Sequence, residues 1–117
     1  MRQFDNYETV STETGTQHRL APGQFELIAK ALADPRRMAL LETISGGREC
    51  PCSRLGSIFS VSKATISHHM KELVTAGLVE SRREGQYLHY CVRRDTLQAY
   101  TAELLRRAGG KAEQKQG

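Results

Sequence analysis

Residues 61–78 read Val-Ser-Lys-Ala-Thr-Ile-Ser-His-His-Met-Lys-Glu-Leu-Val-Thr-Ala-Gly-Leu, and this stretch decides the fold. It predicts one helix with a clear start and a clear end. Ser62 is a good N-cap, because its hydroxyl can accept a hydrogen bond from an unpaired amide of the first turn. Gly77 suits the left-handed turn that ends many helices. Between them, one apolar stripe at helical spacing is expected to face a core: Ile66, Met70, Leu73 and Val74.

The opposite face of this predicted helix is small, polar and basic in its first turns. Side chains of this kind can enter the major groove of DNA, where hydroxyls and cations bond to phosphates and base edges. A solvated surface helix has the same amphipathic pattern, so periodicity alone leaves both interpretations open. The helix residues that we predict to contact DNA are Ser62, Lys63, Ala64, Thr65, Ser67 and His68.

The residues just before this helix complete a helix-turn-helix motif. Residues 53–59 are expected to form a short helix, and Ser60-Val61 a tight turn in which Val61 holds the two helices together. Pro51 precedes the short helix and is tolerated only in a first turn or outside a helix.

Two more helices are predicted upstream, at residues 22–33 and 35–44. Pro22 suits a first turn, and Asp34 is an N-cap followed by a proline at the first helical position. Phe25, Ile28, Ala29 and Leu32 form the stripe of the first helix, and Met38, Leu41 and Ile44 that of the second. The run Ser45-Gly46-Gly47 is expected to end the second helix.

A β-hairpin is predicted directly after residues 61–78. Residues 78–84 and 87–93 alternate as strands around Gly85-Gln86, a two-residue loop that favours a tight turn. Arg82 and Arg83 are expected near its tip. An ordinary surface hairpin is the alternative, but a basic hairpin after such a helix favours a wing that contacts DNA, so both arginines join the predicted contacts.

A last helix is expected to start with Asp95 as its cap and to reach about residue 108. Its stripe is Leu97, Tyr100, Thr101, Leu104 and Ala108, and little of the core is expected to remain for it to cover. We therefore expect it to pack, with the first helix, against a second copy of the chain. A two-fold dimer of this kind presents two reading helices to DNA half-sites about 34 Å apart.

Composition agrees with a single DNA-binding domain. The chain has 117 residues, a net charge of +4 and a pI of about 9.2, which favours an anionic partner. No apolar run approaches the roughly 18 residues of a membrane span, and no signal-peptide core is present, so we expect a cytoplasmic protein without a membrane partner. Catalytic triads, phosphate-binding glycine loops and paired carboxylates are absent, which argues against an enzyme.

The predicted fold is therefore mostly α with a small β-hairpin, in the order α-α-α-α-β-β-α, as a winged helix-turn-helix that dimerises through its first and last helices. Residues 1–20 are polar and aperiodic and are expected to form a flexible N-terminal arm. Residues 21–108 form the DNA-binding domain, and residues 109–117 a polar C-terminal tail.

Four segments together resemble the ArsR/SmtB family of dimeric winged helix-turn-helix repressors. They are Leu32-Ala33-Asp34-Pro35-Arg36-Arg37, residues 61–70, Ala76-Gly77-Leu78-Val79 and Arg83-Glu84-Gly85-Gln86. The resemblance covers roughly residues 22–105. It implies a repressor that binds a double-stranded DNA operator and leaves it when an effector binds or a thiol is modified.

The resemblance also implies a candidate effector site at Cys50 and Cys52, where arsenic and cadmium sensors of the family carry a Cys-x-Cys. Two thiolates can hold one soft ion, such as arsenite, antimonite or a soft metal ion, as an effector; no cofactor is required. The chain departs from the family pattern, because Pro51 lies between the cysteines and Leu55 replaces a third one. A third sulfur would have to come from Cys91, while His18 is the only candidate donor of the N-terminal arm.

Several alternatives stay open. Cys50 and Cys52 are also explained as two partly buried thiols or as a redox dithiol, and the protein then responds to thiol oxidation or to no small ligand. Cys91 and His89 are expected to be ordinary wing residues. His68 and His69 project about 100° apart on a helix, so they are poorly placed to share an ion. A winged helix that binds proteins instead of DNA is a further alternative.

Overall fold

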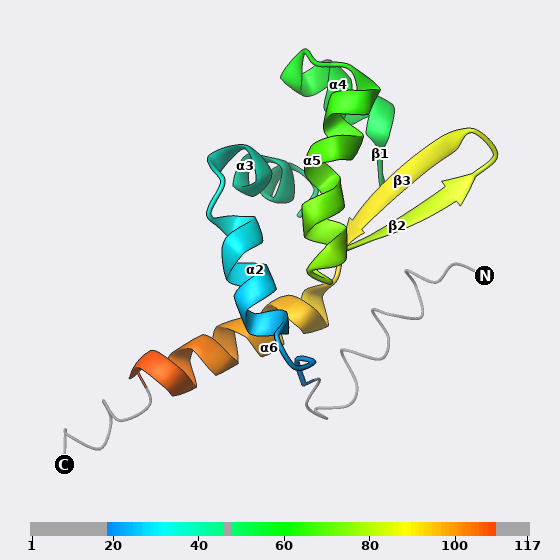
Figure 1. Cartoon of the computed structure of the whole chain (residues 1–117). Helices are drawn as coiled ribbons and strands as arrows, with labels where there is room; N and C mark the ends of the chain where they lie inside the picture. The colour runs from blue at the N-terminus through cyan, green and yellow to red at the C-terminus, as the bar shows by residue number, and fades with distance from the viewer. Residues whose placement is uncertain (1–18, 46–47, 110–117) are drawn as a thin grey trace.

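The computed structural model describes residues 19–45 and 48–109 of the chain, and Figure 1 shows how their elements are arranged. The predicted N-terminal arm with His18, the Gly46-Gly47 part of a helix stop and the predicted C-terminal tail lie almost wholly outside the described residues. No helix in the two described ranges is long and apolar enough to cross a lipid bilayer.

The first described helix, α2 (Gln24–Leu32), begins two residues later than predicted. Gly23 precedes it with a positive φ of 80°, so Pro22 lies in the turn before the helix and not in its first turn. The Gln24 side chain fixes this start, because its Oε1 accepts from the Ala21 amide at 2.8 Å and its Nε2 donates to the Ala76 carbonyl at 2.9 Å. The inward alanine of α2 is Ala31, whereas the predicted Ala29 is exposed.

Helix α3 (Pro35–Thr43) begins as predicted. Asp34 is its N-cap and accepts from the Arg36 amide at 2.8 Å, and Pro35 occupies the first helical position. Its apolar side covers the end of α2 and the side of α5. Leu40 and Leu41 within the helix are buried, and so is Ile44 just after its end.

The helix-turn-helix consists of α4 (Cys52–Phe59) and α5 (Lys63–Thr75). The prediction that Val61 holds the two helices together is wrong, since its side chain is 40% exposed. The backbone holds them instead: the Val61 amide donates to the Gly56 carbonyl at 2.9 Å. A Cβ on Gly56 would lie 2.8 Å from the Val61 carbonyl oxygen, so only glycine permits this approach without a shift.

The wing is a hairpin of β2 (Val79–Glu84) and β3 (Tyr87–Val92), with the predicted two-residue turn and Gly85 at a φ of 64°. A third strand was not predicted. The two-residue β1 (Cys50–Pro51) pairs with β3 and gives the antiparallel order β1-β3-β2. The expected alternation along β3 fails at its end: because β3 is the central strand and ends beside the core, Tyr90, Cys91 and Val92 are all buried.

Helix α6 (Arg94–Leu104) continues into a π-helical turn, η1 (Leu105–Gly109). Asp95 is not its cap, because Arg93 occupies that position and Asp95 lies in the first turn, where it accepts from the Thr96 amide at 2.7 Å. The first half of α6 does cover core, contrary to expectation. The Tyr100 ring lies 5.1 Å from that of Phe25 on α2.

Helix α5 is central to the domain: in Figure 1 it lies between α3 on one side and the wing on the other, with α6 crossing below α2. Its predicted stripe is confirmed, since Ile66, Met70 and Leu73 are almost completely buried. Val74 is partly buried, and Gly77 takes the predicted left-handed conformation at a φ of 83°. Packing of these residues in the core therefore determines which side of α5 faces inward, and the opposite side of the helix is exposed.

Candidate nucleic-acid interface

The start of α5 is built by its cap. The Ser62 hydroxyl oxygen accepts from the Thr65 amide at 3.1 Å, and the hydroxyls of the two residues are 3.0 Å apart. This satisfies one of the amides that a helix start leaves unpaired. The cap therefore stabilises the first turn of α5, from which the exposed side chains project.

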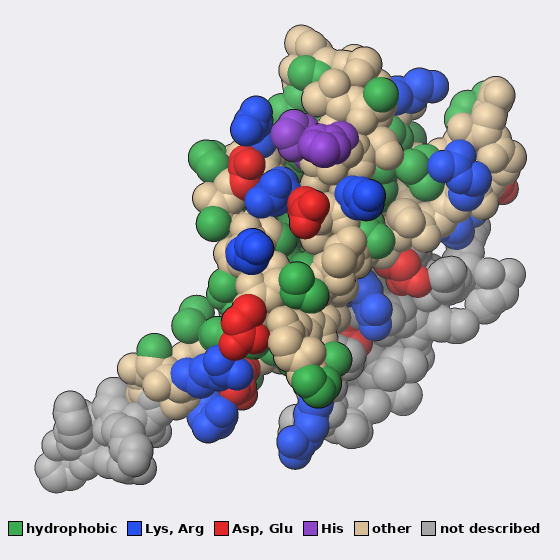
Figure 2. All heavy atoms as spheres, in the orientation of Figure 1, with side chains coloured by type: hydrophobic (Ala, Val, Ile, Leu, Met, Phe, Trp, Pro, Cys, Tyr) green, Lys and Arg blue, Asp and Glu red, His purple; other side chains and the backbone are tan. Residues whose placement is uncertain are grey.

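All six residues predicted to contact DNA from this helix are exposed. They are Ser62, Lys63, Ala64, Thr65, Ser67 and His68. Figure 2 shows histidine side chains on the surface over α5, with Lys and Arg side chains nearby. The His68 ring is 5.6 Å from that of His69, edge to face, and His69 is half-buried. The face is polar, small at Ala64 and open to a partner.

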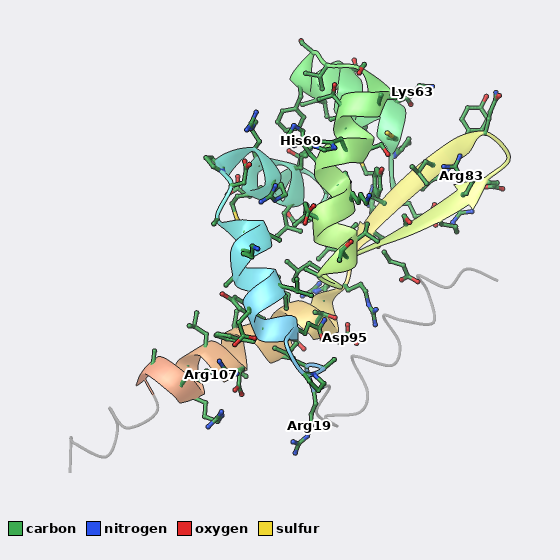
Figure 3. All side chains as sticks on the ribbon, viewed as in Figure 1. Arg19, Lys63, His69, Arg83, Asp95 and Arg107 are labelled. Carbon is green, nitrogen blue, oxygen red and sulfur yellow. The ribbon has the colours of Figure 1, made fainter. Side chains whose placement is uncertain are left out.

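The two wing arginines lie on opposite faces of the sheet. Adjacent residues of a strand project to opposite faces, and directly paired residues share one. Arg83 pairs with Leu88, on the face that carries Tyr90, whereas Arg82 pairs with His89 on the other face. Figure 3 labels Arg83 on the wing and Lys63 at the start of α5. Only one of the two predicted arginines, Arg83, therefore faces α5.

Arg82 is bound within the protein. Its guanidinium contacts both carboxylate oxygens of Glu49, at 2.6 and 3.1 Å, and donates to Glu84 at 2.9 Å. The hydrogen bonds with Glu49 and then Glu84 raise the pKa of Arg82. His89 Nδ1 lies 3.9 Å from the same Glu49 carboxylate. Arg82 thus ties β2 to the segment before β1, and its predicted contact with DNA stays a prediction.

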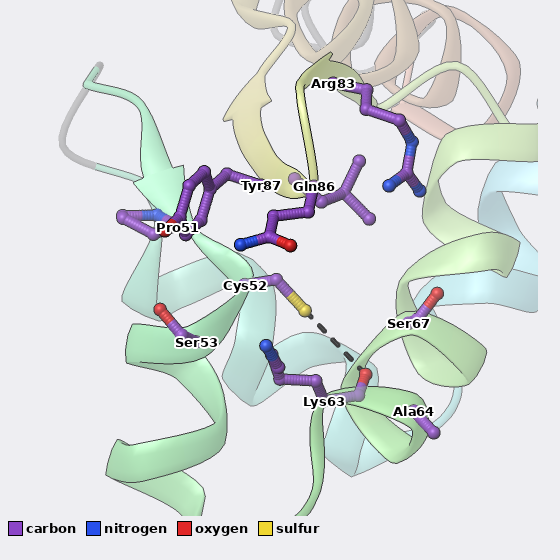
Figure 4. A pocket seen from close by; sticks show the side chains of 10 residues that line it. Pro51, Cys52, Ser53, Lys63, Ala64, Ser67, Arg83, Gln86 and Tyr87 are labelled. Atoms are coloured by element: carbon purple, nitrogen blue, oxygen red, sulfur yellow. Dashed lines mark hydrogen bonds between the residues drawn. The ribbon is translucent and has the colours of Figure 1, made fainter.

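A cleft separates the wing from the start of α5 (Figure 4), with a volume of about 260 Å³. One wall is the helix, the other is the tip of the wing, and the start of α4 forms the floor. In Figure 4 the side chains of Lys63, Arg83 and Gln86 project toward its centre. The residues that line it are Pro51, Cys52, Ser53, Lys63, Ala64, Ser67, Arg83, Gln86, Tyr87 and Leu88.

The three cysteines are free and buried. Cys50 is 8% and Cys52 5% exposed, and they lie on β1 and at the start of α4. Cys50 pairs with Tyr90, so Cys91, the next residue of β3, projects to the other face of the sheet. The structure therefore does not bring Cys91 to the other two thiols. Within residues 19–45 and 48–109, no three His, Cys, Asp or Glu side chains form a group suited to a metal ion.

Cys52 is linked to the first residue of α5. Its thiol donates to the Lys63 carbonyl oxygen at 3.7 Å, as the dashed line in Figure 4 shows. Burial raises the pKa of the Cys50 thiol, with Arg54 opposing the shift. Burial, and next the proximity of Cys52, raises the pKa of Tyr90 to about 12. Both groups are therefore neutral at pH 7, and Tyr90 lies beside Cys52 as a neutral phenol.

Three features of this site were missed from the sequence: Glu49 as the partner of Arg82, Tyr90 beside Cys52, and Gln86 in the cleft. Glu49 and Arg82 are 33 residues apart in the chain, so no local pattern relates them. The Gly85-Gln86 turn was predicted from the sequence. The position of Gln86 in the cleft was missed, because it also depends on the direction in which the hairpin folds back toward α5.

An exposed reading helix in a helix-turn-helix, followed by an antiparallel wing, defines the winged helix-turn-helix class of DNA-binding proteins. Comparisons with known proteins agree. A family described as a helix-turn-helix domain matches residues 32–82. An uncharacterised HTH-type transcriptional regulator of Bacillus subtilis is 36% identical over 79 residues, which cover 67% of this chain and 79% of that protein. The arsenical resistance operon repressor of Staphylococcus xylosus is 42% identical over 62 residues, 53% of this chain and 59% of the repressor.

The chain belongs to the ArsR family of winged helix-turn-helix transcriptional regulators. An ArsR-like regulator from Rhodococcus has a TM-score of 0.66 at 27% identity, over 80% of this chain and 84% of that one. A homodimeric winged helix-turn-helix domain from Mycobacterium bovis has a TM-score of 0.59 at 26% identity, over 75% and 80% of the two chains. The family resemblance and the fold class predicted from the sequence are thus confirmed.

Proposed function

We propose that this regulator is a repressor that binds its operator as a dimer, with α5 in the major groove and the wing against the adjacent sugar-phosphate backbone. One observation carries the proposal: the exposed polar start of α5 and Arg83 of the wing face one another across a single cleft. Lys63, Thr65, Ser67 and His68 offer cations and hydrogen-bonding groups to phosphates and base edges. Such a repressor acts where the DNA is, in the cytoplasm.

A dimer is supported by apolar residues left uncovered on α2 and the end of α6. Leu27, Leu104 and Leu105 are 44%, 43% and 67% exposed in the single chain. These residues lie on the first and last described helices, as expected for the dimer interface. Two copies related by a two-fold axis would place two α5 helices on successive major grooves of a palindromic operator.

Fluorescence anisotropy with DNA from just upstream of the protein's own gene tests this proposal. Lys63→Ala/Arg83→Ala is expected to weaken binding to all sequences, and to lower the salt dependence by roughly one unit of slope per lost phosphate contact. Lys30→Ala removes an exposed cation of α2 and serves as the control with unchanged binding. Equal affinity of the double variant and the wild type would overturn the proposed interface.

The effector is a thiophilic ion bound by Cys50 and Cys52. The two thiols are neighbours at the junction of β1 and α4, and soft ions prefer thiolate ligands. The described residues supply two sulfurs at this place, which suits an ion that accepts two thiolates. Arsenite, when it binds three sulfurs, would need a further donor.

Release from the operator follows from the position of Cys52. A thiol that binds an ion loses its proton, and with it the hydrogen bond to the Lys63 carbonyl. The first turn of α5 would then shift against α4. The ion would bind the shifted form more tightly, and DNA would bind the unshifted form more tightly. Each ligand therefore weakens the binding of the other, and both effects equal the same coupling free energy.

The same anisotropy experiment, with and without arsenite and with a Cys50→Ser/Cys52→Ser variant alongside, tests the effector. Release of the wild type only supports the thiol site. A wild type that ignores arsenite but releases DNA on treatment with an oxidant favours the alternative, a regulator that responds to thiol oxidation. Burial of both thiols, and the raised pKa of Cys50, disfavour the thiolate form, which oxidation and ion binding both require, so the experiment and not the resting state separates the two.

A further inference from the structure

Tyr90 of β3 connects the wing with both helices of the helix-turn-helix. Its side chain is 2% exposed, and its hydroxyl is hydrogen-bonded to Ser67 of α5 and to Cys52 at the start of α4. Cys52 donates in turn to the Lys63 carbonyl oxygen at 3.7 Å. Cys52, Lys63 and Ser67 all lie around the cleft shown in Figure 4. Groups of α5, β3 and α4 therefore form one chain of hydrogen bonds that begins and ends on α5.

The order of donors in this chain is fixed, because each hydroxyl and each thiol has a single proton. A carbonyl oxygen only accepts, so the proton of the Cys52 thiol is directed to Lys63. The Cys52 sulfur can then only accept from Tyr90, and the Tyr90 hydroxyl donates to it. Because the proton of Tyr90 is used in this bond, Ser67 is the donor in the bond between Ser67 and Tyr90.

The pKa of Tyr90 agrees with this order. Burial raises that pKa most, followed by the proximity of Cys52. Of the two hydrogen bonds, the one with Ser67 lowers the pKa and the one with Cys52 raises it. A bond donated to the phenol oxygen stabilises its charged form, whereas a bond that the phenol donates is lost with its proton. Both effects have the sign expected for a phenol that accepts from Ser67 and donates to Cys52.

This order determines what Ser67 can offer to a partner. Ser67 is exposed beside the cleft, but its proton is directed inward to Tyr90, so its remaining lone pairs can only accept. In the major groove, adenine and cytosine present an exocyclic amine that donates, whereas guanine and thymine present an oxygen that accepts. A serine hydroxyl that rotates freely can contact either kind of base. Ser67 cannot, because no proton would lie between its oxygen and that of guanine or thymine.

We propose that Tyr90 is a positioning residue for base recognition, which holds the Ser67 hydroxyl as an acceptor so that it selects adenine or cytosine at one position of each half-site. The inference rests on the proposed function, because it requires α5 in the major groove. Tyr90 is buried and acts only through Ser67. A residue of the wing thus contributes to the sequence preference of a helix to which it does not belong.

Operator duplexes in which each base pair is replaced in turn test the inference by fluorescence anisotropy. For the wild type, exchange of adenine or cytosine for guanine or thymine at the base that Ser67 contacts is expected to weaken binding about tenfold. In Ser67→Ala the contact is absent, and in Tyr90→Phe the freed hydroxyl can donate as well as accept. Both variants should therefore reduce this preference below about twofold, while preferences at other positions persist. Tyr100→Phe is the matched control, since it keeps the ring that contacts Phe25, and should retain the wild-type profile.

The outcomes separate the inference from the proposed function. If Tyr90→Phe weakens binding to all duplexes alike and the preference persists, the role of Tyr90 is only structural and the inference is overturned. Operator binding without any preference that depends on Ser67 also overturns it and leaves the repressor intact. Absence of operator binding by the wild type overturns the proposed function and the base selection together.

The donor order is tested separately in the free protein by NMR. The buried Tyr90 hydroxyl proton is expected to show its stronger nuclear Overhauser effect to the β protons of Cys52. A stronger effect to the β protons of Ser67 would reverse the order of donors and overturn the inference, whatever the result with DNA.

Discussion

Gly56 determines how closely α4 approaches the turn before α5. Its missing side chain leaves room for the Val61 carbonyl oxygen, which would lie 2.8 Å from an added Cβ. This atom belongs to the backbone, so it cannot move aside as a flexible side chain would. The geometry of the helix-turn-helix therefore depends on the absence of one methyl group.

Gly56→Ala is expected to destabilise the domain. Alanine gains up to about 1 kcal/mol in helix propensity, but forcing a methyl group into a packed contact costs about 1–3 kcal/mol. We expect a net loss of roughly 1 kcal/mol in the free energy of unfolding, measured in urea. Ser57→Ala, at the next and exposed position of α4, is the control with unchanged or slightly higher stability. A Gly56→Ala variant as stable as the control would contradict the close approach.

Single residues also show which features of the site could not be predicted from the sequence. The pair Cys50 and Cys52 was predicted as a candidate site from its spacing and from the family resemblance. Their burial was one of the alternatives left open. The hydrogen bond from Cys52 to Lys63 was not predicted, because it depends on how α4 and α5 pack together. Val61 was predicted to hold the two helices of the motif together, although apolar residues are common on protein surfaces.

At the scale of elements, α5 is an example of local signals that suffice. Its cap, its stripe and its terminal glycine all lie within residues 61–78, and each depends on neighbours a few positions away. The turn at Gly85-Gln86 was predictable for the same reason. The strand β1 was not, because two residues carry no periodic pattern and their partners on β3 are 38 to 40 positions distant.

The cap of α5 can be tested apart from its contact with DNA. Ser62→Ala is expected to lower the free energy of unfolding by about 1 kcal/mol, because the Thr65 amide loses its acceptor. Ser62→Asp restores an acceptor at the helix start and should recover that stability. Its charge should nevertheless weaken operator binding by repelling phosphates. Thermal unfolding and anisotropy on the same three proteins check both expectations, and an aspartate variant as unstable as the alanine one would refute the capping role.

Ion pairs stabilise the end of α6 and the turn that follows it. Glu103 contacts Arg106 and Arg107, each at 2.7 Å. The Arg107 guanidinium lies 3.9 Å above the Phe25 ring and 3.6 Å from Glu26, so the cluster connects η1 with α2. The contacts with Arg106 and then Arg107 lower the pKa of Glu103 from its usual 4.5 to about 2.

This lowered pKa fixes the sign of a pH dependence. A carboxyl with a lowered pKa in the folded state contributes stability above its unfolded pKa of 4.5, and that contribution is lost as the pH falls through about 2. Glu103→Gln should therefore be slightly less stable than the wild type at pH 7, with the difference vanishing toward pH 2. Melting temperatures of both proteins between pH 7 and pH 2 measure this. A difference that does not change with pH would show that the carboxylate charge plays no part.

At the scale of the whole molecule, exposed apolar residues occur near the cleft as well as away from it: Tyr87 lines the cleft, and Ile58 and Val61 lie in and just after α4. The exposed leucines belong to α2, α6 and η1, whereas the reading face of α5 is polar. In the proposed dimer, DNA binding and assembly would therefore use different surfaces, and a change that prevents assembly need not disturb the fold of a single chain.

Leu105→Glu is expected to separate the proposed dimer into single chains. Placing an unpaired carboxylate in an apolar interface costs several kcal/mol, so the dimer Kd should rise at least about tenfold. Sedimentation velocity over a range of concentrations measures this, and operator affinity should fall in parallel. Ser45→Glu places the same charge at an exposed position after α3 and should stay dimeric. If both variants sediment as the wild type does, the interface lies elsewhere.

The exposed face of α5 also has a consequence for how such regulators diversify. Ala64 and His68 are exposed, while Ile66, Met70 and Leu73 fill the core. Substitutions at Ala64 or His68 are therefore expected to change the stability of the fold little. After a gene duplication, one copy can change its operator specificity at these positions while both copies still fold. Over evolutionary time, the spacing of core residues along one helix allows a lineage to acquire new target genes one outward residue at a time.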